Sequence, residues 1–417
     1  MFAMMLPSDR QGVRPTSRRR DRVTPSRRRR AARHVVSFNL VALMAALVVS
    51  CGKKPVLRIG PPSSPLAYTN IDVPEVPWSI HVVRVQLSNS VYHVDSMHAG
   101  GGVLGLSTLP AQLKRIPPTL GTPVAAINAD FYERFKAYAG EPRGLQIING
   151  ELLTAPGGEV NFWVDAQGQC HATNVVSHFR VTWPGGTSSP CGLNEERATN
   201  GLVLYTPAMG HSTHTAGGRE LVLGAQGTGL WLPLRIGRTY KARVREIRDK
   251  GDTPLAPGIM VLSIGPVLAP RLPRIAVGQT LAISTATAPD LAGVRTAISG
   301  APMLVRHGRQ LKIPPPRSED YEYTSRLERH PRSAIGWNGS SLFLVVVDGR
   351  QRDLSVGMTL EELASWLVRL GCDEAMNFDG GGSATLWYEG KVRNSPCDHY
   401  LRTIANSLII VRQSSSQ

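Results

Sequence analysis

The stretch NFDGGGS, from Asn377 to Ser383, constrains the backbone more than any other part of this chain, because three consecutive glycines follow a carboxylate directly. Glycine loses more conformational entropy on folding than any other residue, so a glycine run indicates unusual torsions or close approach of another group. Successive amides without side chains can also form a concave anion-binding nest. We therefore expect Gly380, Gly381 and Gly382 to hold an anionic ligand. A tight structural turn beside a core aspartate is the alternative.

The residues before this loop predict where it lies. Thr359 and Glu362 form a T-x-x-E capping box, and apolar residues then recur on one helical face. This pattern predicts a helix over 360–370. The short apolar segment 374–378 predicts a strand. Asp379 would then stand at the carboxyl end of a strand, where sheets commonly present ligands.

Apolar patterns elsewhere predict the fold class. Strand-like runs occur at 123–128 and 341–347, and the region 156–290 is rich in Gly, Pro and Thr with short strand-like runs. We expect a mixed α/β (α+β) protein in which helices flank a central, mostly antiparallel or mixed sheet. Residues 78–412 would form a single catalytic domain, and residues 413–417 a polar tail.

The N-terminal region predicts export. An Arg-rich stretch is followed by an apolar run of sixteen residues that ends just before Cys51. Such a run is short for a membrane span and typical of a secretory signal core. Residues 48–51, VVSC, resemble a bacterial lipobox. We expect a signal peptide over 1–50, a lipid on Cys51 and a Pro- and Ser-rich tether over 51–77. An ordinary signal peptide with an incidental cysteine is the alternative.

This leader also explains most of the basic charge. The chain has a formal net charge of +16, but residues 1–50 hold eleven Arg and two Asp, which leaves about +7 for the rest. A modest excess suits an anionic ligand or an acidic surface, so we expect no nucleic-acid partner. The lipid on Cys51 would make the membrane contact. The protein would then be anchored in the cell envelope, in the outer membrane if the organism has one and otherwise on the outer face of the plasma membrane.

Four further cysteines predict disulfides. An even number in an exported chain indicates pairing, with three possible connectivities. We expect Cys170–Cys191 and Cys372–Cys397, because each pair closes a loop of about 20 to 25 residues.

Six segments occur in an order that points to a known family. They are AAINADFY from Ala125, AISGAPMLVRHGR from Ala297, RHPRSAIG from Arg329, LVVVDGRQ from Leu344, GMTLEELASWLVRLGCDEAMNFDGGGSATL from Gly357 and LRTIANSLII from Leu401. Together they resemble the phosphodiester glycosidase family over roughly residues 78–412, most weakly in the middle. The best-known member removes N-acetylglucosamine from a phosphodiester on lysosomal glycoproteins, and bacterial members are often described as exopolysaccharide-related.

The resemblance implies hydrolysis of the bond between a sugar C1 and a phosphate oxygen. It assigns Asp379 and Asp130 to the sugar side, as nucleophile, as general base or as stabilisers of an oxocarbenium-like transition state. Arg332 and Arg402 match family arginines and would grip the phosphate. The full set of substrate-binding candidates is Asn128, Arg332, Asp348, Gly380, Gly381, Gly382, Ser383 and Arg402. No cofactor is required for this chemistry.

Several of these residues have a structural alternative. Asn128 can cap the turn after its strand, and Asp348 can form a hairpin turn with the glycine that follows it. Arg332 can be a surface residue. Ser383 can bond to its own loop instead of a ligand.

Two other functions use the same residues. The protein could bind anionic glycans without hydrolysing them, in exopolysaccharide assembly. It could also be a metal-dependent phosphodiesterase in which Asp130 and Asp379 hold Mg²⁺ or Ca²⁺. The sequence offers no histidine or acidic cluster to complete such a metal site.

Overall fold

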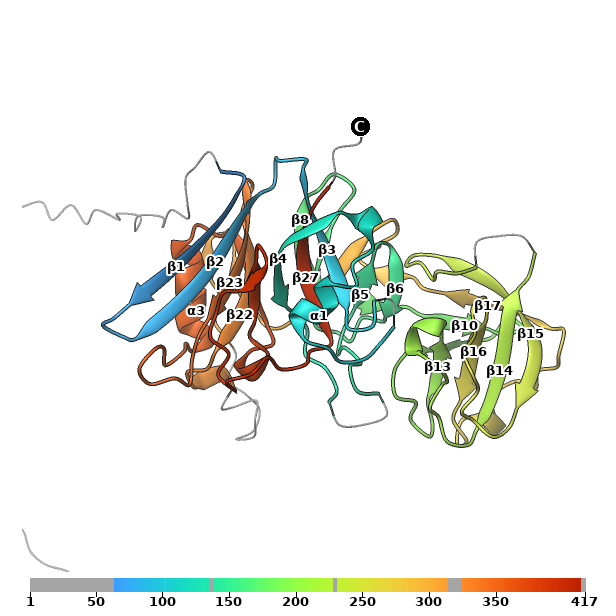
Figure 1. Cartoon of the computed structure of the whole chain (residues 1–417). Coiled ribbons are helices and arrows are strands. Elements are labelled where there is room, and N and C mark those ends of the chain that lie inside the picture. The colour runs from blue at the N-terminus through green and yellow to red at the C-terminus, as the bar shows by residue number, and fades with distance from the viewer. Residues whose placement is uncertain (1–63, 102, 135–137, 228–230, 314–324, 414–417) are drawn as a thin grey trace, which may run out of the picture. The chain divides into compact units, whose positions relative to one another are not determined.

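The computed structural model describes residues 64–101, 103–134, 138–227, 231–313 and 325–413. Residues 54–417 form one compact unit (Figure 1). The predicted signal peptide and Cys51 lie outside the described residues. Within the described ranges, no helix is both long and apolar enough to cross a membrane.

The strand that leads to the glycine loop belongs to a seven-stranded sheet of the described chain. In spatial order its strands are β1 (Leu66–Val73), β2 (Trp78–Gln86), β23 (Ser341–Val347), β22 (Arg332–Trp337), β24 (Glu374–Phe378), β20 (Met303–Arg306) and β21 (Arg309–Gln310). Strand β1 falls inside the segment 51–77, for which the sequence predicted a tether. It pairs antiparallel with β2 along its whole length, so ordered structure begins before Trp78.

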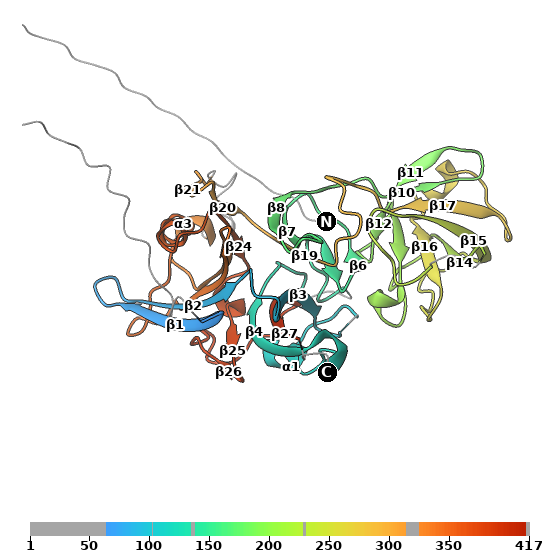
Figure 2. The ribbon, with the colours of Figure 1, turned by 90° about the horizontal axis from the view of Figure 1, so that it is seen from above.

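Both faces of β23 are buried, and its alternating side chains enter two different cores. Leu342, Leu344 and Val346 pack into one hydrophobic cluster, whereas Phe343 and Val345 pack into another. The second cluster includes the apolar face of α3 (Leu360–Arg369), which contacts β20 and β21 (Figure 2). The predicted helix over 360–370 is therefore confirmed, with its capping box formed by Thr359 and Glu362.

A prediction about stability follows from this cap. Thr359→Ala removes the hydroxyl that accepts the backbone N–H of Glu362 at 3.1 Å. We expect the free energy of unfolding to fall by about 1 kcal/mol, measured by urea denaturation. Thr359→Ser keeps the hydroxyl and should lose much less. An alanine variant as stable as the parent would show that the cap contributes nothing.

A second sheet covers the other face of β23. Its strands in the described residues are β26 (Lys391–Val392), β25 (Leu386–Tyr388), β4 (Thr122–Asn128), β27 (Asn406–Arg412) and β3 (Tyr92–His98), accompanied by α1 (Leu109–Leu113) and the 3₁₀ turn η1 (Pro118–Leu120). Figure 1 shows β3, β27 and β4 side by side. Ile127 of β4 and Leu408 of β27 share a core with Leu344 of β23. This packing brings the end of β4 next to the end of β24.

The middle of the chain forms further sheets. One contains β6 (Glu151–Thr154), β5 (Gln146–Ile148), β19 (Thr296–Gly300), β7 (Val160–Val164) and β8 (Cys170–Asn174), and a small one pairs β18 (Thr287–Ala288) with β9 (Val176–Ser177). The largest contains β11 (Ser188–Pro190), β10 (Arg180–Thr182), β17 (Thr280–Ser284), β15 (Thr239–Arg248), β14 (Arg219–Ala225), β16 (Met260–Ile264), β13 (Leu202–Tyr205) and β12 (Gly192–Leu193). The described residues also contain the 3₁₀ turns η2 (Pro207–Met209), η3 (Ala269–Arg271) and η4 (Gly381–Ser383).

The predicted α/β class was wrong, because the described chain is mostly β. Instead of helices on both faces, sheet packs on sheet over one face of β23, and α3 covers the other. The region 156–290, read as short strand-like runs, supplies most of the additional strands and a core of its own. Some of its strands pair over long sequence distances, such as β10 with β17, and no local pattern specifies such pairing.

Neither predicted disulfide is formed, and the four cysteines of the described residues are free thiols. Cys170 packs against the core beneath β23, whereas Cys191 packs against the core of the eight-stranded sheet. Cys372 is buried under α3, while Cys397 lies in a loop beside Asp398. Spacing in sequence therefore did not place either pair of thiols together.

Candidate active site

Asp379 follows β24 directly and is held in place by the end of β4. Its backbone N–H donates to the Ala129 carbonyl at 2.8 Å, and its own carbonyl accepts from the Asn128 side-chain amide at 2.6 Å. The end of β4, a strand of a different sheet, therefore fixes the backbone of this aspartate at the end of β24.

Asn128 acts as a junction in this arrangement. Its carbonyl oxygen accepts from the Ser333 hydroxyl at 2.7 Å and from the Thr385 backbone N–H at 3.0 Å, while its amide donates to Asp379. The residue is 1% exposed. Both the amide N–H group and the carbonyl oxygen of this side chain are therefore hydrogen-bonded, and Asn128 holds the backbone of Asp379 in place.

Asp130 lies two residues beyond the end of β4 and is also buried. Its carboxylate accepts the Gly144 N–H at 2.9 Å, and its own N–H donates to the Asn406 side chain at 2.9 Å. The pKa of Asp130 is raised to about 8, mainly by burial and in part by the negative charges of Glu159 and Asp379, while the Gly144 hydrogen bond opposes the rise.

The pKa of the Asp379 carboxyl is raised less than that of Asp130. Burial raises the pKa of Asp379 to about 6, while the Ser383 hydroxyl and the positive charge of Arg402 oppose that rise. Two neighbouring carboxyls therefore have pKa values pushed apart on either side of neutrality, an arrangement typical of an acid and base pair. At pH 7 Asp379 is mainly ionised and Asp130 mainly protonated.

Two hydroxyl groups accompany these carboxyls. The Ser383 oxygen is buried and close enough to the Asp379 carboxyl and the Tyr132 hydroxyl to lower the pKa of both, although none of its contacts in the described residues has the geometry of a full hydrogen bond. The Tyr132 hydroxyl donates to the Thr403 carbonyl at 2.7 Å. Sequence reasoning did not select Tyr132, although it closes the AAINADFY segment that carried the resemblance.

The three glycines serve close approach by groups of the protein itself. A Cβ atom on Gly380 would lie 2.5 Å from the Pro331 carbonyl oxygen, and one on Gly382 would overlap Arg402 and Asp398. Gly381 has a φ of +59°, and its N–H donates to Pro331 at 2.9 Å. At least one amide of the expected anion nest therefore already has a protein partner.

Two arginines approach successive glycines of the loop. Arg402 lies over Gly382 and forms an ion pair with Asp398 at 2.7 Å. The exposed side chain of Arg350 lies beside Gly381, where a Cβ atom would come within 3.3 Å of its guanidinium, and it donates to His330 at 3.2 Å. Sequence reasoning missed Arg350, which belongs to the quoted VDGRQ segment.

Arg332 and Asp348 make contacts of a different kind. The buried Arg332 guanidinium donates to the backbone carbonyls of Met358 and Glu328, at 2.7 and 2.9 Å. Asp348 is 2% exposed and accepts from His81 at 2.8 Å, from the Ser395 N–H at 2.8 Å and from Asn394 at 3.3 Å.

Asn394 connects Asp348 to the segment that follows the glycines. Its amide donates to the Ala384 carbonyl at 3.0 Å, and its carbonyl accepts the Leu386 N–H at 2.8 Å. Asp348 therefore supports the glycine loop indirectly, through Asn394.

A cavity of about 320 Å³ lies near these carboxyls, although neither Asp130 nor Asp379 lines it. Glu159 and Arg143 line it, and these residues act electrostatically on Asp130 and Asp379 respectively. In the described part of the chain, no three or more His, Cys, Asp or Glu side chains group closely enough to hold a metal ion.

Two solved structures have a similar fold. A hypothetical protein from Synechocystis matches with a TM-score of 0.65 and 19% identity, covering 83% of this chain and 61% of that one. A putative exported protein from Burkholderia pseudomallei matches with a TM-score of 0.63 and 21% identity, covering 80% of this chain and 74% of that one. At these identities the likeness concerns the fold alone.

Sequence comparisons found similarity over part of the chain. The SPbeta prophage-derived uncharacterized protein YomE of Bacillus subtilis is 37% identical over 83 residues, which is 20% of this chain and only 13% of that protein. The model of the phosphodiester glycosidase family matches residues 263–411, which include the glycine loop. This region therefore resembles a phosphodiester glycosidase domain, and it contains five of the six segments that carried the predicted resemblance, which is confirmed for them.

Proposed function

We propose that the protein is a hydrolase that cleaves the C1–O bond of glycosyl phosphodiesters. The family match supports a glycosidase-type activity. The observation that carries the finer proposal is a pair of carboxyls, the buried Asp130 and the partly buried Asp379, with pKa values of about 8 and 6. Guanidinium groups lie at the neighbouring glycines. Two such carboxyls on the sugar side and cations on the phosphate side match the two halves of this substrate.

Each carboxyl has a role that suits its protonation state. Asp379, ionised at neutral pH, acts at the anomeric carbon, as a nucleophile or by activating a water, and stabilises the oxocarbenium-like transition state. Asp130, protonated at neutral pH, donates its proton to the oxygen that leaves with the phosphate. A protonated Asp130 also avoids a second negative charge beside Asp379 and the substrate.

The phosphate would bind at the guanidinium groups over the glycine loop. Arg402 acts on the nearer carboxylate directly, since its positive charge lowers the pKa of Asp379. Arg350 reaches the loop at Gly381, one residue along. Arginine forks bind phosphate oxygens in pairs, so these two groups would fix the phosphate while the sugar faces Asp379.

Steady-state turnover of methyl diesters of sugar 1-phosphates tests this proposal. The panel should begin with N-acetylglucosamine and include other hexoses, with release of free sugar as the measurement. Many turnovers per protein molecule are expected for at least one diester. Stoichiometric binding without release across the panel would contradict the enzyme and favour a glycan-binding protein.

The two pKa values predict a bell-shaped pH dependence. We expect kcat/KM to rise through about pH 6 as Asp379 loses its proton, and to fall through about pH 8 as Asp130 loses its own. Asp130→Asn cannot ionise, so it should lower the maximum and abolish the alkaline limb. An unchanged alkaline limb in that variant would assign this titration to another group.

We also propose that the protein is exported and lipid-anchored through Cys51 in the cell envelope. The apolar run and the VVSC stretch before this cysteine support the proposal. Cys51→Ala should abolish labelling by a radioactive fatty acid and move the protein out of the membrane fraction. Equal labelling of the parent and the variant would contradict the anchor.

A further inference from the structure

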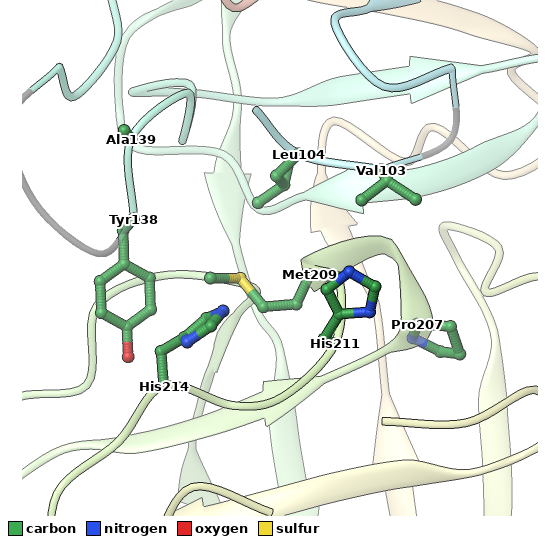
Figure 3. Close-up of a pocket in the computed structure, with 9 residues that line it drawn as sticks. Val103, Leu104, Tyr138, Ala139, Pro207, Met209, His211 and His214 are labelled. Carbon is green, nitrogen blue, oxygen red and sulfur yellow. The ribbon is translucent and has the colours of Figure 1, made fainter. Parts of the chain in front are cut away.

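A second cavity, of about 370 Å³, lies outside the candidate active site. Its lining includes Tyr138, Met209, His211 and His214 (Figure 3). In this view the Met209 side chain extends between the two imidazoles. We propose that this cavity binds a copper ion through the Met209 thioether and the imidazoles of His211 and His214.

The donor set selects the metal. A thioether is a soft ligand that favours Cu(I), and imidazole nitrogen suits copper as well, whereas Mg²⁺ and Ca²⁺ require oxygen ligands. The three donors come from one short stretch, Met-Gly-His-Ser-Thr-His. Both imidazoles are exposed, while Met209 is 6% exposed. A metal ion can therefore reach the histidines from solvent and meet the sulfur deeper in the cavity.

Hydrogen bonds set the tautomer of His214. The Ser212 hydroxyl donates to the Asp252 carboxylate at 2.5 Å, and the same oxygen lies 3.3 Å from His214 Nδ1. Because its hydrogen is used by Asp252, the hydroxyl can only accept from Nδ1–H. The neutral ring then carries its lone pair on Nε2. Metal-binding histidines are typically oriented in this way, by a partner that fixes the other ring nitrogen.

Hydrogen bonds from neighbouring segments hold the loop that carries both histidines. Glu220 is 0% exposed and accepts from the Thr215 hydroxyl at 2.8 Å and from the Thr253 N–H at 2.9 Å. The Leu255 N–H donates to the His211 carbonyl at 2.9 Å. These contacts hold the backbone near the donors before any ligand binds, which lowers the entropic cost of assembling a site.

Copper titration tests the proposal directly. The full protein, with accessible thiols alkylated because its five cysteines would also bind copper, is titrated with Cu(I) under ascorbate against bicinchoninate. We expect one equivalent to bind, with the affinity lowered about tenfold or more in Met209→Leu, His211→Asn and His214→Asn. Met209→Leu keeps an apolar side chain of similar size, so it isolates the sulfur. His178→Asn, an exposed histidine that does not line this cavity, should bind as the parent does.

A measurement on the parent protein alone keeps the proposal testable if a variant does not fold. X-ray absorption of the copper-loaded, alkylated protein should show mixed nitrogen and thioether sulfur coordination. Equal copper affinity in the parent and the three variants would overturn the proposal. So would the absence of bound copper after alkylation, or coordination without nitrogen.

Discussion

Asp379→Asn is expected to lower turnover of a glycosyl phosphodiester by about 1,000-fold or more, because it removes the carboxylate proposed to act at the anomeric carbon. The fold should persist. The folded protein binds the Asp379 proton more tightly than the unfolded chain does, so stability at this position is lost as pH rises toward about 6. An asparagine never ionises, so the variant should be more stable than the parent at pH 8, by on the order of 1–2 kcal/mol.

Asp373→Asn provides the matched control, since this exposed aspartate immediately precedes the same strand. Activity and thermal unfolding should both be measured from pH 5 to pH 9 for the two variants and the parent. Activity of Asp379→Asn within threefold of the parent would remove this residue from the chemistry.

Gly382→Ala is expected to produce the second large effect, a fall in kcat/KM of about 100-fold or more. The new Cβ atom would overlap the Arg402 guanidinium and the Asp398 carboxylate, so the ion pair must move. That movement displaces the charge that opposes the rise in the Asp379 pKa. We therefore expect the acidic limb of the pH profile to shift upward as well.

Gly339→Ala makes the same chemical change where the added Cβ atom meets nothing within 4 Å. This variant should keep the kcat/KM and the pH profile of the parent. If Gly382→Ala behaves in the same way, the close approach of Arg402 to the loop has no part in catalysis.

Local signals in the sequence predicted local structure well. The capping box at Thr359 and Glu362 and the apolar face after it predicted α3 to within about a residue, and the segment 374–378 forms β24. Such features depend on hydrogen bonds and packing within one turn or one strand. The predicted position of Asp379, directly after this strand, is also confirmed.

The fold class depends on contacts that no single segment reveals. Strand β4 pairs with β27, nearly 300 residues later, and the apolar residues of β23 divide between two cores. After its first residue β23 is wholly apolar, and such a strand can be covered by helices or by another sheet. The prediction of helices on both faces was therefore wrong for one face of β23, which packs against another sheet.

In the candidate site, too, sequence predicted some features correctly and could not reveal others. The order of the six segments pointed to Asp130 and Asp379, and the structure brings these two residues together. Sequence could not reveal that the Arg332 guanidinium donates to backbone carbonyls, or that Asp348 accepts from His81. Arg350 was missed because only the folded loop places it beside Gly381.

Hydrolysis in ¹⁸O-labelled water tests the central claim, cleavage at the sugar carbon, most directly. The protein is incubated with N-acetylglucosamine 1-(methyl phosphate), or with the best diester of the panel, and both products are weighed by mass spectrometry. Label in the free sugar is the predicted result, because water or a water-derived hydroxyl then attacks C1. Label in the phosphate would mean cleavage of the P–O bond and would contradict a glycosidase acting through Asp379.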